Sequence, residues 1–118
     1  MSCVKTIPDV SAGSDIAYTW RYKDYDNAYP SISDATARFK GVHNDNEIFD
    51  ISIGNPTTGT KVTLENDAKG DYLAIHIAGT DTAGLSGDLT VYSVVDSAES
   101  GRRTEALIVF ELCYRGDL

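Results

Sequence analysis

The strongest constraint on the fold of this chain is a hydrophobic period of two residues. Apolar and polar side chains alternate over residues 16–22, 36–40, 49–53, 61–65 and 72–77. Successive side chains of a strand point to opposite faces, so each run predicts a β-strand with one face toward a core. Turn-forming residues flank these runs, as at 11–13, 44–46, 54–56 and 66–70. We therefore expect short strands joined by tight turns.

The end of the chain predicts a longer hairpin. Residues 88–96 and 103–114 form two extended runs, and residues 97–101 between them are small or polar. Only residues 80–85 lack strand character, and Thr80 is a candidate N-cap for one short helical turn there. The chain has 118 residues, with no linker or internal repeat. It therefore predicts a single domain over residues 1–118, an all-β antiparallel β-sandwich of about seven to eight strands.

The last predicted strand departs from simple alternation. Ala106, Ile108, Phe110 and Leu112 fill one face, while Leu107 and Val109 make the centre of the other face apolar as well. A strand with one solvated face should be polar on that face. Two interpretations stay open: a loop covers this second face, or the face is buried against another subunit.

Charge and hydropathy exclude several classes of partner. Ten Lys and Arg stand against eighteen Asp and Glu, so the formal net charge is -8. Nucleic acid is an unfavourable partner, because phosphate binding needs a clustered basic surface. The longest apolar stretch, residues 106–110, is far below the roughly 20 residues that span a bilayer, and no run of signal-peptide length lies near the N-terminus. We expect synthesis in a cytoplasm and no membrane partner.

Catalytic and metal sites have little support in the sequence. His43 lies in a polar turn, where we expect solvation, and His76 falls on the outward phase of its strand. The oxygen-rich segments 24–27 and 44–47 do not match an EF-hand loop. We expect no enzyme and no metal. Cys3 and Cys113 are either free thiols, as in a reducing cytoplasm, or the ends of one long bridge.

The tyrosine-rich segment 22–30 is the most unusual stretch. It places three of the seven tyrosines in a polar loop. Tyrosine combines a broad apolar face with a hydrogen-bonding tip, which suits interfaces and sugar stacking. Tyr25 and Tyr29 are therefore candidate anchors, although tyrosines that cap the ends of the core would give the same pattern.

Several segments resemble a viral family. Residues 32–39 read I-S-D-A-T-A-R-F, and Gly13-Ser14-Asp15 precedes the first long alternating run. Residues 80–87 are rich in Thr and Ala and close with Leu85 and Gly87, and residues 88–95 and 101–104 suit a closing hairpin with a Gly-Arg turn. In this order they resemble the N-terminal domains of upper baseplate proteins of tailed bacteriophages, over roughly residues 13 to 112.

The resemblance implies a β-sandwich without enzymatic activity or cofactor, which assembles into rings or clusters with other phage virion proteins. We expect a structural virion component of the tail or baseplate, neck or head surface, a homo-oligomer in the particle. Leu107, Val109, Tyr25 and Tyr29 are its candidate contact residues. The alternatives are a carbohydrate- or receptor-binding module built on Tyr25 and Tyr29, and a bacterial immunoglobulin-like domain.

Overall fold

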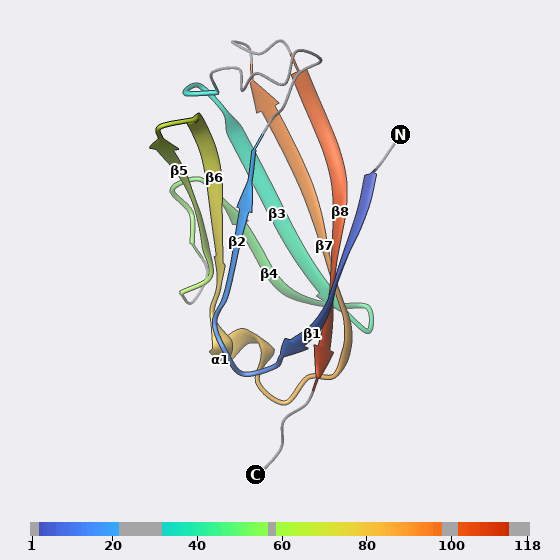
Figure 1. The fold of residues 1–118 in the computed structure, drawn as a ribbon. Coiled ribbons are helices and arrows are strands. Elements are labelled where there is room, and N and C mark those ends of the chain that lie inside the picture. The colour runs from blue at the N-terminus through green and yellow to red at the C-terminus, as the bar shows by residue number, and fades with distance from the viewer. Residues whose placement is uncertain (1–2, 22–31, 57–58, 98–101, 114–118) are drawn as a thin grey trace.

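Two β-sheets packed face to face make up the fold (Figure 1). The computed structural model describes residues 3–21, 32–56, 59–97 and 102–113. The elements in chain order are β1 (Cys3–Ser11), β2 (Ile16–Trp20), β3 (Thr36–His43), β4 (Asn46–Ser52), β5 (Lys61–Asp67), β6 (Gly70–Ile77), α1 (Gly79–Thr82), β7 (Gly87–Ser97) and β8 (Arg102–Cys113). One sheet has the order β1-β8-β7-β3-β4 and the other the order β2-β6-β5. The predicted all-β sandwich is confirmed.

The hairpins follow the predicted pattern of alternation and turns. β7 and β8 pair antiparallel from Gly87 with Leu112 to Ser97 with Arg102. β3 pairs antiparallel with both β4 and β7, and β6 pairs antiparallel with both β2 and β5. Only one neighbouring pair is different.

That pair is β1 with β8, which run parallel in an otherwise antiparallel sandwich. The sequence does not reveal β1 as a strand, because its pattern is interrupted. Pro8 lacks a backbone donor, Asp9 has a φ of 56°, and the register with β8 shifts between Ile7 and Val10. Such a proline and bulge are tolerated at an edge strand, which needs ladder hydrogen bonds on one side only.

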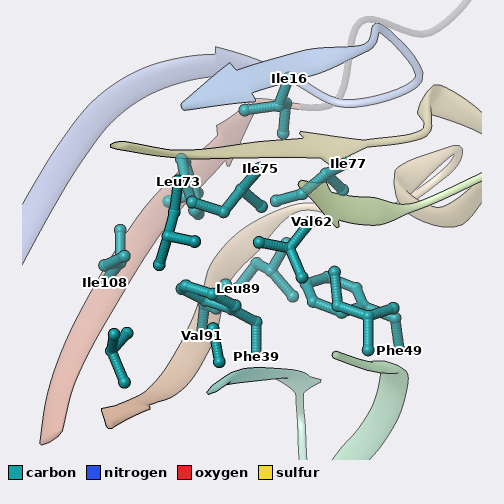
Figure 2. Packing of buried hydrophobic residues seen from close by; sticks show 14 of the residues in the cluster. Ile16, Phe39, Phe49, Val62, Leu73, Ile75, Ile77, Leu89, Val91 and Ile108 are labelled. Carbon is teal, nitrogen blue, oxygen red and sulfur yellow. The ribbon is translucent and has the colours of Figure 1, made fainter. Parts of the chain in front are cut away.

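The core lies between the two sheets. Figure 2 shows Ile16, Leu73 and Ile75 of the smaller sheet pointing toward side chains of the larger one. The larger sheet contributes Phe39, Phe49, Leu89, Val91 and Ile108, each at most 3% exposed. The inward side chains all come from alternate positions of their strands, as the period of two requires.

The short helix α1 corrects one detail of the prediction. Its N-cap is Ala78, which makes no side-chain capping bond, rather than Thr80. Partners from elsewhere in the chain satisfy this end instead. Asp15 Oδ1 accepts from Gly79 N at 2.7 Å, and Thr60 Oγ1 accepts from Ala78 N at 3.0 Å. Contacts distant in sequence thus replace the expected local cap.

The two cysteines lie at opposite ends of the β1–β8 pair. Cys3 is in register with Ala106, and Ser11 is in register with Cys113. Seven residues of β8 separate these positions, which is roughly 23 Å along a strand. A disulfide needs Cα atoms within about 7 Å, so this arrangement favours the free-thiol interpretation, and Cys113 is a free thiol.

Candidate functional site

The outer face of the five-stranded sheet carries an apolar surface. Val91, Ile108 and Phe110 point into the core, so the residues that alternate with them on β7 and β8 point outward. The parallel register extends this face onto β1. We call the apolar and aromatic residues at its centre the outer band: Val4, Tyr92, Val94, Leu107 and Val109.

The strand register makes the outer band continuous. Leu107 pairs with Val4 on one side and with Tyr92 on the other. Val4 is 62% exposed and Tyr92 is 49% exposed, whereas Leu107 and Val109 are half-buried by their neighbours. Among the described residues, no segment covers Val4 or Tyr92. A covering loop, one of the two interpretations of the apolar second face, is therefore not found over these two positions. Burial of Leu107 and Val109 against another subunit stays a prediction.

The other two predicted contact residues cannot be placed on this surface. Tyr25 and Tyr29 lie in segment 22–31, outside the residues that the structure describes. Their predicted role as loop anchors therefore stays a prediction.

Ion pairs border the outer band on the β3–β4 side. Arg38 donates to Asp50 through Nε at 2.9 Å and through Nη2 at 2.5 Å. These hydrogen bonds from Arg38 lower the pKa of Asp50 and, in return, raise the pKa of Arg38. Lys40 lies beside Glu47 with an Nζ–Oε1 distance of 3.6 Å. Both cations thus already have a carboxylate partner.

The hairpin end of β7 and β8 is also charged. Arg103 contacts Asp96 at 3.4 Å and Glu105 at 3.5 Å. All three side chains are more than half exposed. An apolar centre with a rim of paired charges is the usual composition of a protein–protein contact surface.

Two shallow hollows lie along this face. One of about 170 Å³ is lined by Arg38, Lys40, Tyr92 and Val94, at the edge of the outer band. The other, of about 290 Å³, is lined by Thr36, Ala37, Arg38, Ser52, Val94, Asp96 and Arg103. The charged groups of the larger hollow pair with carboxylates of the same chain. The two hollows therefore offer shape and apolar contact rather than a free charge for a ligand.

The histidines have structural partners. His43 is 8% exposed, and its Nε2 lies 2.7 Å from the Ser86 carbonyl, so the expected solvation is wrong. The ring is buried because β3 ends next to the segment that contains Ser86 and leads into β7. His76 Nε2 lies 3.3 Å from Asp15 Oδ2, as an outward position allows. The hydrogen bond from Gly79 N–H lowers the pKa of Asp15 the most, and the hydrogen bond with His76 lowers it further.

The described part of the chain offers neither a metal-binding cluster nor a helix that could span a membrane. It contains no group of three or more His, Cys, Asp or Glu side chains that could hold a metal ion. The oxygen-rich segment 24–27 lies outside that part. Within the described residues, no helix has the length and apolar character needed to cross a bilayer.

Three residues of the outer band, Val4, Tyr92 and Val94, are absent from the sequence-based candidates. Tyr92 sits on the polar phase of its strand between Val91 and Ser93, so the period of two could have placed it outward. Val4 had no such signal, because the alternation of β1 is interrupted at Pro8. The register with β8 is what brings Val4 beside Leu107.

Comparisons with known proteins identify a shared fold. No protein-family model and no curated protein matches the chain. A variant of the endo-fucoidan hydrolase MfFcnA4 from glycoside hydrolase family 107 superimposes with a TM-score of 0.50 at 9% identity, over 96% of this chain. A second structure of that hydrolase gives a TM-score of 0.45 at 13% identity, also over 96% of this chain. The chain spans 13% of the hydrolase in each case, so the likeness concerns the sandwich alone.

Proposed function

We propose that this chain is a non-enzymatic structural component of a tailed phage virion, in the tail or baseplate, neck or head surface, that acts through protein–protein contacts. The observation that carries the proposal is the outer band, an apolar surface with Val4 and Tyr92 largely open to solvent. The viral setting comes from the resemblance of the sequence to upper baseplate N-terminal domains.

The physical argument for a contact surface rests on apolar area. Removing apolar surface from water contributes roughly 25 cal/mol per Å². Continuous exposed apolar surface bordered by polar groups is typical of interaction sites in otherwise ordinary domains. On the outer band, Leu107 and Val109 lie between Val4 and Tyr92 at the centre of that surface. Docking the outer band on another virion protein would remove it from water.

The alternative is a carbohydrate- or receptor-binding module. One structural neighbour is an endo-fucoidan hydrolase, of which this chain spans 13%. Tyr25 and Tyr29 would form the sugar platform. Glycan binding that Tyr25→Ala abolishes, with mass and fold unchanged, would favour this alternative.

Particle composition tests the virion proposal. Tailed particles purified from cells that encode this chain should contain it at a regular copy number, measured by quantitative mass spectrometry. Leu107→Asp plus Val109→Asp should lower that copy number on the order of ten-fold or more, because the two carboxylates would be desolvated in the contact.

A matched control keeps the result specific. Lys61→Asp plus Thr63→Asp places two carboxylates on outward positions of β5, in the other sheet. This control should enter particles at the wild-type level, and circular dichroism should show that both double variants fold. Particles without the chain would contradict the virion proposal, and undiminished copy number of the Leu107/Val109 variant would contradict the role of the outer band.

A further inference from the structure

We infer that the outer band pairs with a second copy of this chain, about a two-fold axis that runs along β7. The inference rests on the proposed function only for the choice of surface. The second copy as the partner, and the register in which the two copies meet, both follow from how residues are arranged on either side of β7.

Three cross-strand rows are centred on β7. The rows contain Arg38, Val94 and Glu105; Lys40, Tyr92 and Leu107; and Val42, Thr90 and Val109. In each row the β7 residue is in the middle, β3 lies on one side and β8 on the other. A two-fold axis along β7 keeps each row at its own level and exchanges its two ends.

This exchange makes the outer band complementary to itself. In the first row, Arg38 of one copy, which is paired with Asp50, faces Glu105 of the other, which contacts Arg103, so the charges alternate along this set. The same set forms again across the axis. In the second row, the aliphatic part of Lys40 lies over Leu107. In the third row, Val42 meets Val109. The first row brings a cation opposite an anion, and the second and third rows bring apolar side-chain atoms together on either side of Tyr92 and Thr90.

The smaller hollow supports this register. Arg38, Lys40, Tyr92 and Val94 line it, so it lies between β3 and β7. In the paired arrangement β8 of the second copy runs above this position. Leu107 of the second copy therefore has a hollow of about 170 Å³ in which to sit. A protruding side chain facing a hollow is how well-packed interfaces exclude water.

Carboxylates limit the paired surface at both ends of β7. Asp96 lies one row beyond Val94, and Asp88 lies one row beyond Thr90. Each would approach its own counterpart at the axis, which opposes closer contact there. Arg103, 3.4 Å from Asp96, offsets this repulsion at one end. The contact is therefore confined to the three central rows and their flanking strands.

The available area suits a dimer of modest affinity. Five strands spaced about 4.8 Å apart, each with about five residues in the three central rows, present roughly 400 Å². Two copies would bury roughly 800 Å², below the range of stable interfaces, so we expect a weak dimer. The formal net charge of -8 on each copy also opposes association. A salt concentration of about 0.15 M screens that repulsion beyond about 8 Å.

Charge reversal tests the register. We would measure solution mass by analytical ultracentrifugation from about 1 µM to about 1 mM, the range in which interfaces of this size dissociate. The wild-type chain should form a dimer. Arg38→Glu and Glu105→Arg should each weaken it on the order of 10- to 100-fold, because each change places like charges together twice across the axis.

Mixing the Arg38→Glu and Glu105→Arg variants tests whether positions 38 and 105 meet across the dimer. A mixed dimer joins Glu at position 38 of one copy to Arg at 105 of the other, and it keeps the native Arg38–Glu105 pair on the other side. Dimer affinity should return to within about ten-fold of the wild-type value. Repair within one chain cannot explain this result, because each chain carries one change only.

Matched controls come from the three-stranded sheet. Lys61→Glu and Glu65→Arg reverse the same charges at exposed positions of β5 and should leave the dimer unchanged. Thermal unfolding followed by circular dichroism should show that every variant folds. Should a reversal unfold the chain, Arg38→Gln, Glu105→Gln and their combination supply a double-mutant cycle, in which the two sites must couple.

Each other outcome overturns the inference. A wild-type monomer over the whole range excludes the second copy as the occupant. A dimer that ignores both reversals uses another surface, and a dimer that the mixture does not restore uses another register. The virion proposal is judged separately by particle composition: a monomer found in particles refutes only the dimer, and a dimer absent from particles refutes only the viral setting.

Discussion

At the scale of single residues, Gly41 shows why one side chain must be absent. Gly41 of β3 pairs with Phe49 of β4, and the Phe49 ring lies close against the glycine. A Cβ atom built on Gly41 would overlap three ring carbons of Phe49. Because Phe49 is 1% exposed and packed in the core, the ring cannot move freely.

Gly41→Ala should therefore lower the free energy of unfolding by about 1–3 kcal/mol, the usual cost of overpacking a core. Urea unfolding followed by tryptophan fluorescence measures this difference. Thr36→Ala, at an exposed position of the same strand, is the control and should change stability by no more than about 0.5 kcal/mol. Equal stability of Gly41→Ala and the wild type would show that the ring has room to shift.

At the scale of elements, one ion pair connects the end of β2 to the turn between β5 and β6. Arg21 donates to both carboxylate oxygens of Asp67, at 3.0 and 2.7 Å, and its guanidinium lies 4.7 Å from the centre of the Tyr72 ring. Hydrogen bonds to Asp67 lower the pKa of its carboxyl group to about 2. The bonds from Arg21 contribute the most, and the bond from the backbone N–H of Lys69 comes second.

This pKa predicts an acid-dependent loss of stability. The folded value of about 2 lies below the unfolded value of about 3.9, so the stabilisation is complete above about pH 5 and falls as the pH drops through 2. Asp67→Asn should be less stable than the wild type at pH 7, and the difference should shrink toward pH 2. Urea unfolding at several pH values measures this.

The control for Asp67 is Asp88→Asn, which removes one carboxylate from an exposed position of β7. It should preserve the pH dependence of the wild type between pH 5 and 2. A pH-independent gap between Asp67→Asn and the wild type would mean that Asp67 acts through shape or turn geometry rather than through its charge.

At the scale of the whole molecule, the parallel pairing of β1 with β8 keeps the two cysteines apart. Cys3 of β1 is in register with Ala106 of β8, seven residues before Cys113 on the same strand. Cys113 Sγ lies 3.9 Å from Asp9 Oδ1, on the bulged part of β1. The first and last strands are neighbours, but their shared direction places the two cysteine positions at opposite ends of the pair.

Both thiols should therefore stay free within one chain. Denaturing alkylation without reductant should add two iodoacetamide groups to the monomer, as intact-mass measurement shows. Cys3→Ser and Cys113→Ser should each accept one group, which assigns the labels. An unlabelled monomer lighter by two hydrogens would demonstrate an internal bridge and refute the parallel register.

Local alternation accounts for most of the predicted fold. Strands such as β4 and β7 were visible in the sequence because burial of one sheet face alternates with exposure of the other, and a period of two needs no knowledge of the partner strand. The hairpin of β7 and β8 follows from the same signal and a short polar connection. Neither β1 nor the burial of His43 has such a local signature.

The candidate site divides in the same way. The apolar second face at Leu107 and Val109 was evident from the sequence, because two apolar residues occupy a phase that solvent should make polar. Val4, Tyr92 and Arg38 join that face only through strand pairing. Alternation specifies which side of a strand a residue occupies, whereas its neighbours depend on strand order and register. Those are set by the packing of whole sheets, so only the tertiary structure brings the five residues of the outer band together.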